Sequence, residues 1–150
     1  MTSAVKAQIL DDMKAAMRGH EKTRLATIRL ILAALKQKEV DERITLTDEH
    51  VTAILDKMVK QRRESISQFR TANRQDLVEK EQAEIHVIQQ YLPTQLTLAE
   101  IDALVVAAVK ESGATSARDM GKVMAILRPQ AQGRADMALV STKVKEHLSS

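Results

Sequence analysis

Four charged residues occupy positions where helical periodicity predicts apolar ones, and they are the best candidates for chemistry. Projected at about 100° per residue, Arg24 and Arg62 fall within the apolar arcs of two predicted helices. Glu81 and Glu84 flank the apolar direction of a third. Paired carboxylates can bind a metal ion or transfer protons, whereas carboxylates that meet guanidinium groups form a structural network. We expect the network, with direct contacts from either arginine to the glutamates, because His86 projects away from both carboxylates.

No other residues match the spacing of a catalytic, metal or cofactor site. The four histidines lie far apart without metal-ligand spacing: His20, His50, His86 and His147. The absence of cysteine excludes disulfides, thiolate zinc sites and cysteine nucleophiles. The sequence also lacks a Walker loop, a paired-glycine dinucleotide fingerprint and a nucleophile elbow. We therefore predict no catalytic residues, no metal site and no cofactor.

A further set of charged residues lies on the outer side of the third predicted helix and its continuation. The basic residues that project away from its apolar stripe are Lys60, Arg63, Arg70 and Arg74. They could contact the phosphates of a nucleic acid, or they could form a solvated helix face with acidic partners at helical spacing. No aromatic residue is interleaved with them, so we do not expect bases to stack there.

Helices must position all of these residues. The chain is 44% apolar and 29% charged, as in globular proteins, and its four Gly and two Pro are too few for a β-sandwich or barrel. A turn or loop is expected from Pro129 to Ala135. Apolar spacing and capping residues predict an all-α fold, with helices over roughly 3–18, 22–40, 48–72, 74–92, 97–112, 117–127 and 137–148.

The segment 92–97 indicates a boundary between two helical modules. Pro93 should stop the fourth helix. Thr97 and Glu100 have the spacing of a capping box, and Gly113 fits the C-terminal end of the helix that they begin. We predict an N-terminal four-helix module over residues 1–92, joined by a Pro linker to a small three-helix C-terminal module over residues 97–150.

Charge and targeting signals limit the environment and the partners of the chain. The net charge of +3 and the pI near 9.3 come from mixed charges, so any nucleic-acid surface requires local clustering. The N-terminus lacks the basic start and apolar run of a signal peptide, and no run of 18 apolar residues could span a membrane. We expect a cytoplasmic protein without membrane contact and without DNA as a partner.

Five short segments resemble the GatB/YqeY family. Their sequences are RLATIR, QRRESI, YLP, DMGKVM and GRAD, at residues 24–29, 61–66, 91–93, 119–124 and 133–136. They lie along nearly the whole chain, which makes the resemblance specific. It implies an N-terminal four-helix body and a C-terminal domain similar to the tail of GatB, a subunit of the tRNA-dependent amidotransferase. The large catalytic domain that precedes this tail in GatB has no counterpart here.

The resemblance implies contact with tRNA through the C-terminal module. It directs attention to Lys122 and Arg134, which we expect not to be needed for packing, and to neighbouring Arg128, Lys143 and Lys145. The hypothesis that follows is a tRNA-associated, RNA-binding accessory protein without chemistry of its own. One alternative is a component of a carbon–nitrogen ligase with glutamine as amido-N-donor. The other is a protein–protein adaptor that binds another protein and no RNA.

Overall fold

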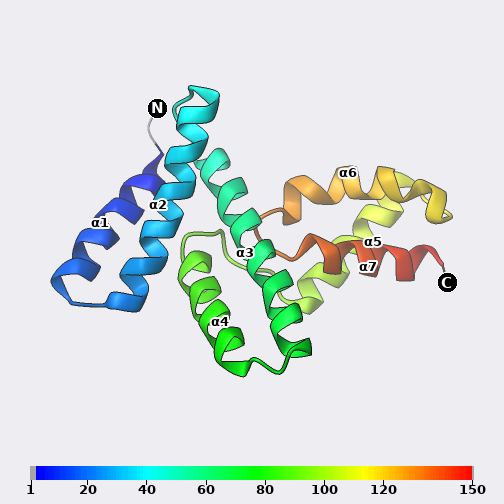
Figure 1. Ribbon diagram of the computed structural model, residues 1–150. Helices are drawn as coiled ribbons and strands as arrows, with labels where there is room; N and C mark the ends of the chain where they lie inside the picture. Colours follow the sequence, from blue (N-terminus) through cyan, green and yellow to red (C-terminus); the bar gives the residue numbers. More distant parts are fainter. Residues whose placement is uncertain (1–2, 150) are drawn as a thin grey trace. The chain divides into compact units, whose positions relative to one another are not determined.

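The computed structural model describes residues 3–149 and is helical throughout (Figure 1). Within these residues there are seven α-helices and one short 3₁₀ helix, and no strand is formed beyond an isolated bridge between Gln132 and Ala135. The prediction of an all-α fold is confirmed. None of these helices has the length and apolarity needed to cross a membrane.

The elements follow the predicted order. They are α1 (Ala4–Arg18), α2 (Lys22–Glu42), α3 (Asp48–Thr71), α4 (Gln75–Gln89), α5 (Leu98–Ser112), η1 (Ala117–Asp119), α6 (Met120–Ala131) and α7 (Met137–Leu148). The chain divides between Leu92 and Pro93 into two compact units, which we call unit 1 and unit 2. Helices α1–α4 form the first, and α5–α7 form the second.

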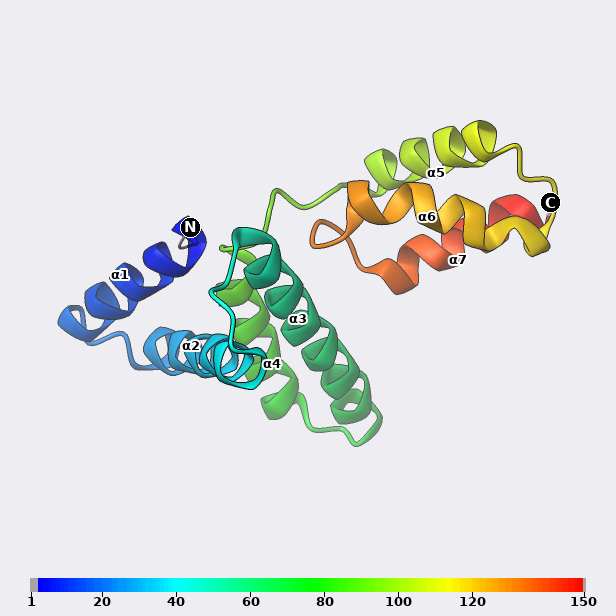
Figure 2. The same cartoon turned by 90° about the horizontal axis from the view of Figure 1, so that it is seen from above.

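Unit 1 is held together by an aliphatic core. Helix α3 packs most extensively against α4, and the two views agree that these helices lie side by side (Figures 1 and 2). Helices α1 and α2 pack against each other and against this pair. Burial of apolar surface drives this packing, at about 25 cal/mol per Å² removed from water. The hydrophobic residues that are at most 1% exposed are Ile9, Ala16, Ile28, Ile31, Leu35, Leu46, Val51, Leu55, Val59, Val78 and Ile88.

Unit 2 is a three-helix bundle with its own core. Its start follows the sequence, because Thr97 accepts a hydrogen bond from the Glu100 backbone and the Glu100 side chain accepts one from the Thr97 backbone. Gly113 ends α5 with a φ of 70°, a left-handed conformation that costs glycine little. Asp136 caps α7 by accepting from the backbone N–H of Ala138. The core side chains that are at most 1% exposed are Val105, Val123, Leu127, Ala131, Val140 and Val144.

The structure corrects the predicted loop from Pro129 to Ala135. Helix α6 continues through Pro129 to Ala131, so the loop begins at Gln132. Proline in a helix removes one hydrogen bond, but here only two helical residues follow it. Ala131 is 1% exposed in the core of unit 2, and its carbonyl accepts from the backbone N–H groups of Arg134 and Ala135. These contacts outweigh the local cost of Pro129.

Candidate functional site

The first charged cluster joins α3 to α4 within unit 1. Arg62 Nε donates to Glu84 Oε2 at 2.8 Å, and Arg62 Nη1 donates to the carbonyl of Met58 at 3.2 Å. The two side chains are only 14% and 12% exposed. This is one of the contacts that the helical projection anticipates. Its guanidinium and carboxylate satisfy each other, which suits helix pairing rather than proton transfer.

Arg24 belongs to a different cluster, and the expected contact with Glu81 or Glu84 is not formed. Its guanidinium lies 3.7 Å from a carboxylate oxygen of Asp12 and 3.6 Å from one of Glu21. Its Nε is buried and has no hydrogen-bond partner among the described residues. A projection of one helix gives the direction of a side chain but not its neighbour, and α1 supplied a nearer carboxylate than α4.

Asp12 also accepts a hydrogen bond from the hydroxyl of Tyr91 at 2.5 Å, which joins α1 to the end of unit 1. Burial, followed by the hydrogen bond to the Asp12 carboxylate, raises the pKa of Tyr91 to about 12. Sequence reasoning missed both residues. The signal for Asp12 was available, because it projects about 60° from Ile9 on the apolar side of α1.

Glu81 is half-buried and forms no ion pair within residues 3–149. The structure therefore pairs two of the four predicted network residues, Arg62 and Glu84, while Arg24 pairs with Asp12 and Glu81 takes no part in either ion pair. No group of three or more His, Cys, Asp or Glu side chains in the described part of the chain could hold a metal ion.

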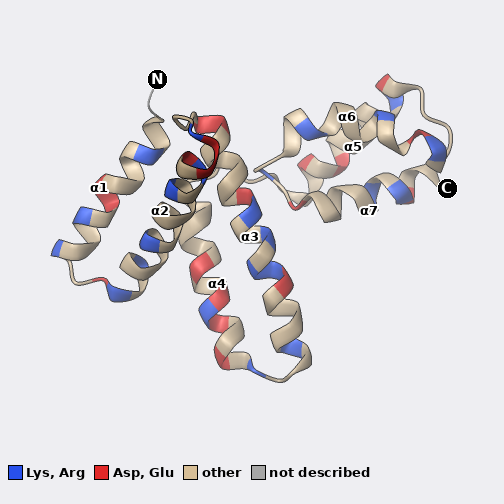
Figure 3. Cartoon of the chain, turned by 45° about the horizontal axis from the view of Figure 1, so that its top comes forward, with Lys and Arg blue, Asp and Glu red and all other residues tan. Residues whose placement is uncertain are grey.

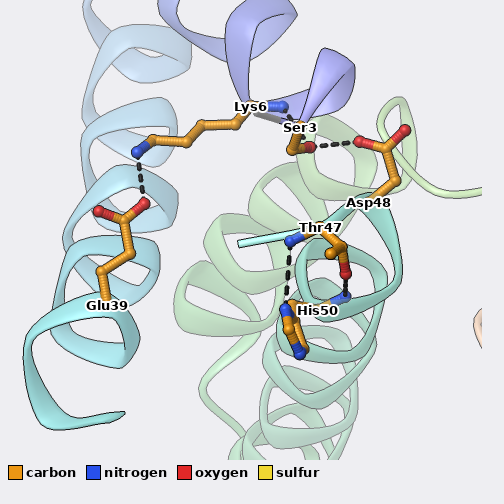
Figure 4. Close-up of polar contacts among 6 residues, drawn as sticks. All are labelled: Ser3, Lys6, Glu39, Thr47, Asp48 and His50. Carbon is orange, nitrogen blue, oxygen red and sulfur yellow. Dashed lines mark hydrogen bonds and ion pairs between the residues drawn. The ribbon is translucent and has the colours of Figure 1, made fainter. Parts of the chain in front are cut away.

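A polar cluster lies at the starts of α1 and α3 (Figure 4). The Ser3 hydroxyl caps α1 and donates to Asp48, whose carboxylate also accepts from the backbone N–H of Val5 at 3.2 Å. These bonds hold the pKa of Asp48 below its usual value, the contribution of Ser3 being the largest. Thr47 and His50 complete a capping box at the start of α3. The cluster positions helices, and we assign it no chemistry.

The basic residues predicted on the outside of α3 do not all behave alike. Arg74 pairs with Asp76 beyond the end of α3, with Nη2 and Oδ2 3.0 Å apart. Lys60 is exposed. Arg63 and Arg70 line a surface hollow of about 490 Å³ between α3 and α4. Figure 3 shows basic residues recurring along α3, whereas the charged residues of α4 are mostly acidic.

The basic residues predicted in unit 2 are spread over its surface. Lys122 is 72% exposed and lies 3.8 Å from a carboxylate oxygen of Asp119 in the preceding turn. Arg128 is exposed near the end of α6, about 9 Å along the helix and about 120° around it from Lys122. Lys145 is exposed in the last turn of α7. These three cations do not converge on one point.

Lys143 and Arg134 have structural contacts. Lys143 Nζ lies 3.7 Å from Asp102 Oδ1, an ion pair between α7 and α5, and its side chain is 28% exposed. The expectation that Arg134 is not needed for packing is wrong. Its Nε donates to the carbonyl of Thr94 at 3.1 Å, and its own carbonyl accepts from the backbone N–H of Leu96 at 2.8 Å. Arg134 thus fixes the linker to the loop before α7.

Comparison with known proteins identifies related chains. The family described as Yqey-like protein matches residues 6–148. Among curated relatives, a protein of Pyrenophora tritici-repentis named "Altered inheritance of mitochondria protein 41, mitochondrial" is 38% identical over 151 residues, which cover 96% of this chain and 81% of the relative. A protein of the same name from Eremothecium gossypii is 44% identical over 87 residues, or 57% of this chain and 48% of the relative. Another from Lachancea thermotolerans is 42% identical over 103 residues, or 66% of this chain and 54% of the relative. The last two matches span about half the length of those relatives.

These names contradict the prediction of a cytoplasmic protein. All three relatives are named as mitochondrial, and they point to that organelle instead. The sequence reasoning tested for a secretory signal peptide and for a membrane-spanning apolar run. Neither test bears on import into mitochondria, so the cytoplasmic prediction did not follow from them.

Proposed function

Because the chain belongs to the YqeY-like protein family, we propose that it is an accessory protein that binds tRNA or another structured RNA and performs no chemistry by itself. The buried charged groups support the second half of the proposal. The Arg62–Glu84 pair and the Asp12 cluster use their carboxylates to join helices. A function for such a chain belongs to its surface.

One observation carries the RNA-binding proposal: the charge along the second half of α3. Residues 57–70 contain five basic side chains and one acidic one, Glu64. Arg62 turns inward to an ion pair with Glu84 of α4. Lys57, Lys60 and Arg70 are exposed on the remaining faces of the helix. A local excess of cations of this kind attracts a phosphate backbone even when the net charge of the whole chain is small.

Unit 2 contributes to the proposal through Lys122, Arg128 and Lys145, which are exposed. Arg134 and Lys143 act within it as positioning residues. The proposal includes a relation of unit 2 to the tail of GatB, suggested by residues 119–124 and 133–136. In that case any carbon–nitrogen ligase activity with glutamine as amido-N-donor would belong to a partner subunit. The names of the relatives support mitochondria as the place of action.

A filter-binding titration with total tRNA, including mitochondrial tRNA, tests this function. We expect binding at micromolar protein that weakens at least tenfold between about 50 and 200 mM salt. Reversing three exposed cations of unit 2 (Lys122→Glu, Arg128→Glu and Lys145→Glu) should weaken binding more than three matched reversals on α1 and α2 (Lys14→Glu, Lys22→Glu and Lys36→Glu). Equal effects of the two triple variants would refute a role for unit 2, and no salt-sensitive binding at all would refute the function.

A protein–protein adaptor remains the second candidate, because α5 exposes apolar side chains. Leu98 is 61% exposed and Val106 is 50% exposed, each about one helical turn from Asp102, on opposite sides of it along α5. Val106 and Asp102 line a surface hollow of about 460 Å³ between α5 and α7. A partner that co-purifies with the chain and survives nuclease treatment, but is lost with Leu98→Ser and Val106→Ser, would favour the adaptor over the RNA-binding protein.

A further inference from the structure

The hollow between α3 and α4 differs in its charge from two other surface hollows, one between α2 and α3 and one between α5 and α7. Its lining contains two guanidinium groups, those of Arg63 and Arg70, and no carboxylate. By contrast, the hollow between α2 and α3 is lined by cations together with Asp41. The hollow between α5 and α7 is also lined by both signs of charge. A concave surface lined by one sign of charge concentrates the opposite charge near it.

Two acidic residues of α4 are paired with arginines outside the lining of this hollow. Glu84 is paired with Arg62 at 2.8 Å, and Asp76 with Arg74 at 3.0 Å. Neither carboxylate lines the hollow. The carboxylates of α4 therefore lie outside the lining of the hollow.

The remaining lining groups suit an oxyanion. Ile66, 7% exposed, and Ile85 provide apolar lining, while Ser67 and Gln82 supply side-chain donors. The Thr71 hydroxyl donates to the carbonyl of Ser67 at 3.1 Å. Neither the Ser67 hydroxyl nor the Gln82 amide has a hydrogen-bond partner among residues 3–149, so both can donate outward.

The helical positions place these groups together. Arg63, Ser67 and Arg70 are spaced at i, i+4 and i+7 on α3 and therefore share one face, which borders α4. The dipole of α3 by itself accounts for a cation in the last turn, where Arg70 lies. It does not account for Arg63, which lies about two turns earlier and lines the same hollow.

We propose that the hollow formed by Arg63, Ser67, Arg70 and Gln82 binds a backbone phosphate of RNA, an inference that rests on the RNA-binding function proposed above. Planar guanidinium groups match phosphate oxygens with paired hydrogen bonds. No aromatic side chain lines the hollow. The site therefore contacts the backbone and reads no base.

Binding of a defined tRNA transcript to the full chain at several salt concentrations tests the site. Replacing both arginines (Arg63→Gln with Arg70→Gln) should weaken binding about tenfold and make the plot of log K against log salt less steep by about 1–2. A matched control removes two exposed guanidinium groups from α1 and α2 (Arg18→Gln with Arg29→Gln). It should change binding less than threefold, and circular dichroism checks that both variants are folded.

A second variant keeps both arginines and places a carboxylate between them. Ser67 is exposed, so Ser67→Glu should fold, and it should weaken binding about as much as the arginine pair does. Amide chemical shifts of the labelled wild-type chain should change on RNA addition around residues 63–71 and 82–85. Normal RNA affinity of both hollow variants, or shift changes confined to unit 2, would overturn this inference and leave the proposed function standing. No RNA binding by the wild-type chain would overturn both.

Discussion

Replacing Glu84 tests whether inward-facing charges serve packing. The Glu84→Gln variant removes the carboxylate but keeps the size of the side chain, and it leaves Arg62, 14% exposed, without its counter-charge. A hydrogen bond to a charged group contributes about 1.5–3 kcal/mol. Because the pair is largely buried, we expect the variant to lose about 2 kcal/mol of the free energy of unfolding of unit 1.

Urea unfolding measures this loss, and Tyr91 makes the assay specific. It is the only tyrosine of a chain without tryptophan, and it lies in unit 1. Its fluorescence therefore follows unit 1 even if the two units unfold separately. With a slope of about 2 kcal/mol per molar urea, the midpoint should fall by about 1 M.

Two controls separate the ion pair from a general effect of substitution. Glu81→Gln alters a half-buried carboxylate three residues away that has no ion pair within residues 3–149, and it should change stability by less than about 0.5 kcal/mol. Replacing both partners with apolar residues (Arg62→Met with Glu84→Leu) should stay within about 1 kcal/mol of the wild type. If Glu84→Gln costs no more than Glu81→Gln, the pair does not hold α3 against α4 and the reasoning is refuted.

Three further predictions concern groups outside the proposed RNA surface. At pH 11 an ordinary tyrosine is about 90% ionised, but Tyr91, with a pKa of about 12, should be about 10% ionised when its absorbance is measured at 295 nm. Asp12→Asn should lower the pKa of Tyr91 to between 10 and 12, because the burial of the ring remains. An unchanged titration would contradict the hydrogen bond between Tyr91 and Asp12. Because its pKa is lowered by folding, the ionised Asp48 carboxylate stabilises unit 1 at pH values above the unfolded pKa near 3.8, and this stabilisation is lost as pH falls through the folded pKa. The urea midpoint should therefore fall less steeply between about pH 5 and 2.5 in Asp48→Asn than in the wild type. Parallel curves for the two proteins would exclude this role. Gly113→Ala should lower the free energy of unfolding of unit 2 by about 1 kcal/mol, because alanine is strained at a φ of 70° although there is free space for its Cβ. Thermal unfolding measures this change. No loss of stability would mean that the turn relaxes.

Local signals in the sequence predicted the helix ends well. The pair Thr97 and Glu100 lies within one turn, and Gly113 needs only its own backbone freedom, so neither depends on distant parts of the chain. Pro129 shows the limit of such signals. Its local cost is real, but the buried position of Ala131 two residues later decides where α6 ends, and burial depends on the whole bundle.

Directions of side chains were predictable, and their partners only partly. The projection of α3 and α4 anticipated that Arg62 meets Glu84. It could not anticipate that Arg24 meets Asp12, because the order in which helices neighbour one another is not contained in any single helix. The hollow has the same limit, since the spacing of Arg63 and Arg70 is visible in the sequence but the side chains that α4 adds are not.

The salt dependence of tRNA binding by the unmodified chain tests the central claim most directly. The claim is that packing occupies the interior and that exposed cations on α3 and unit 2 contact a phosphate backbone. It predicts a straight plot of log K against log salt with a slope steeper than about −3, corresponding to four or more phosphate contacts. A slope near zero, or no binding at micromolar protein in about 50 mM salt, would contradict it.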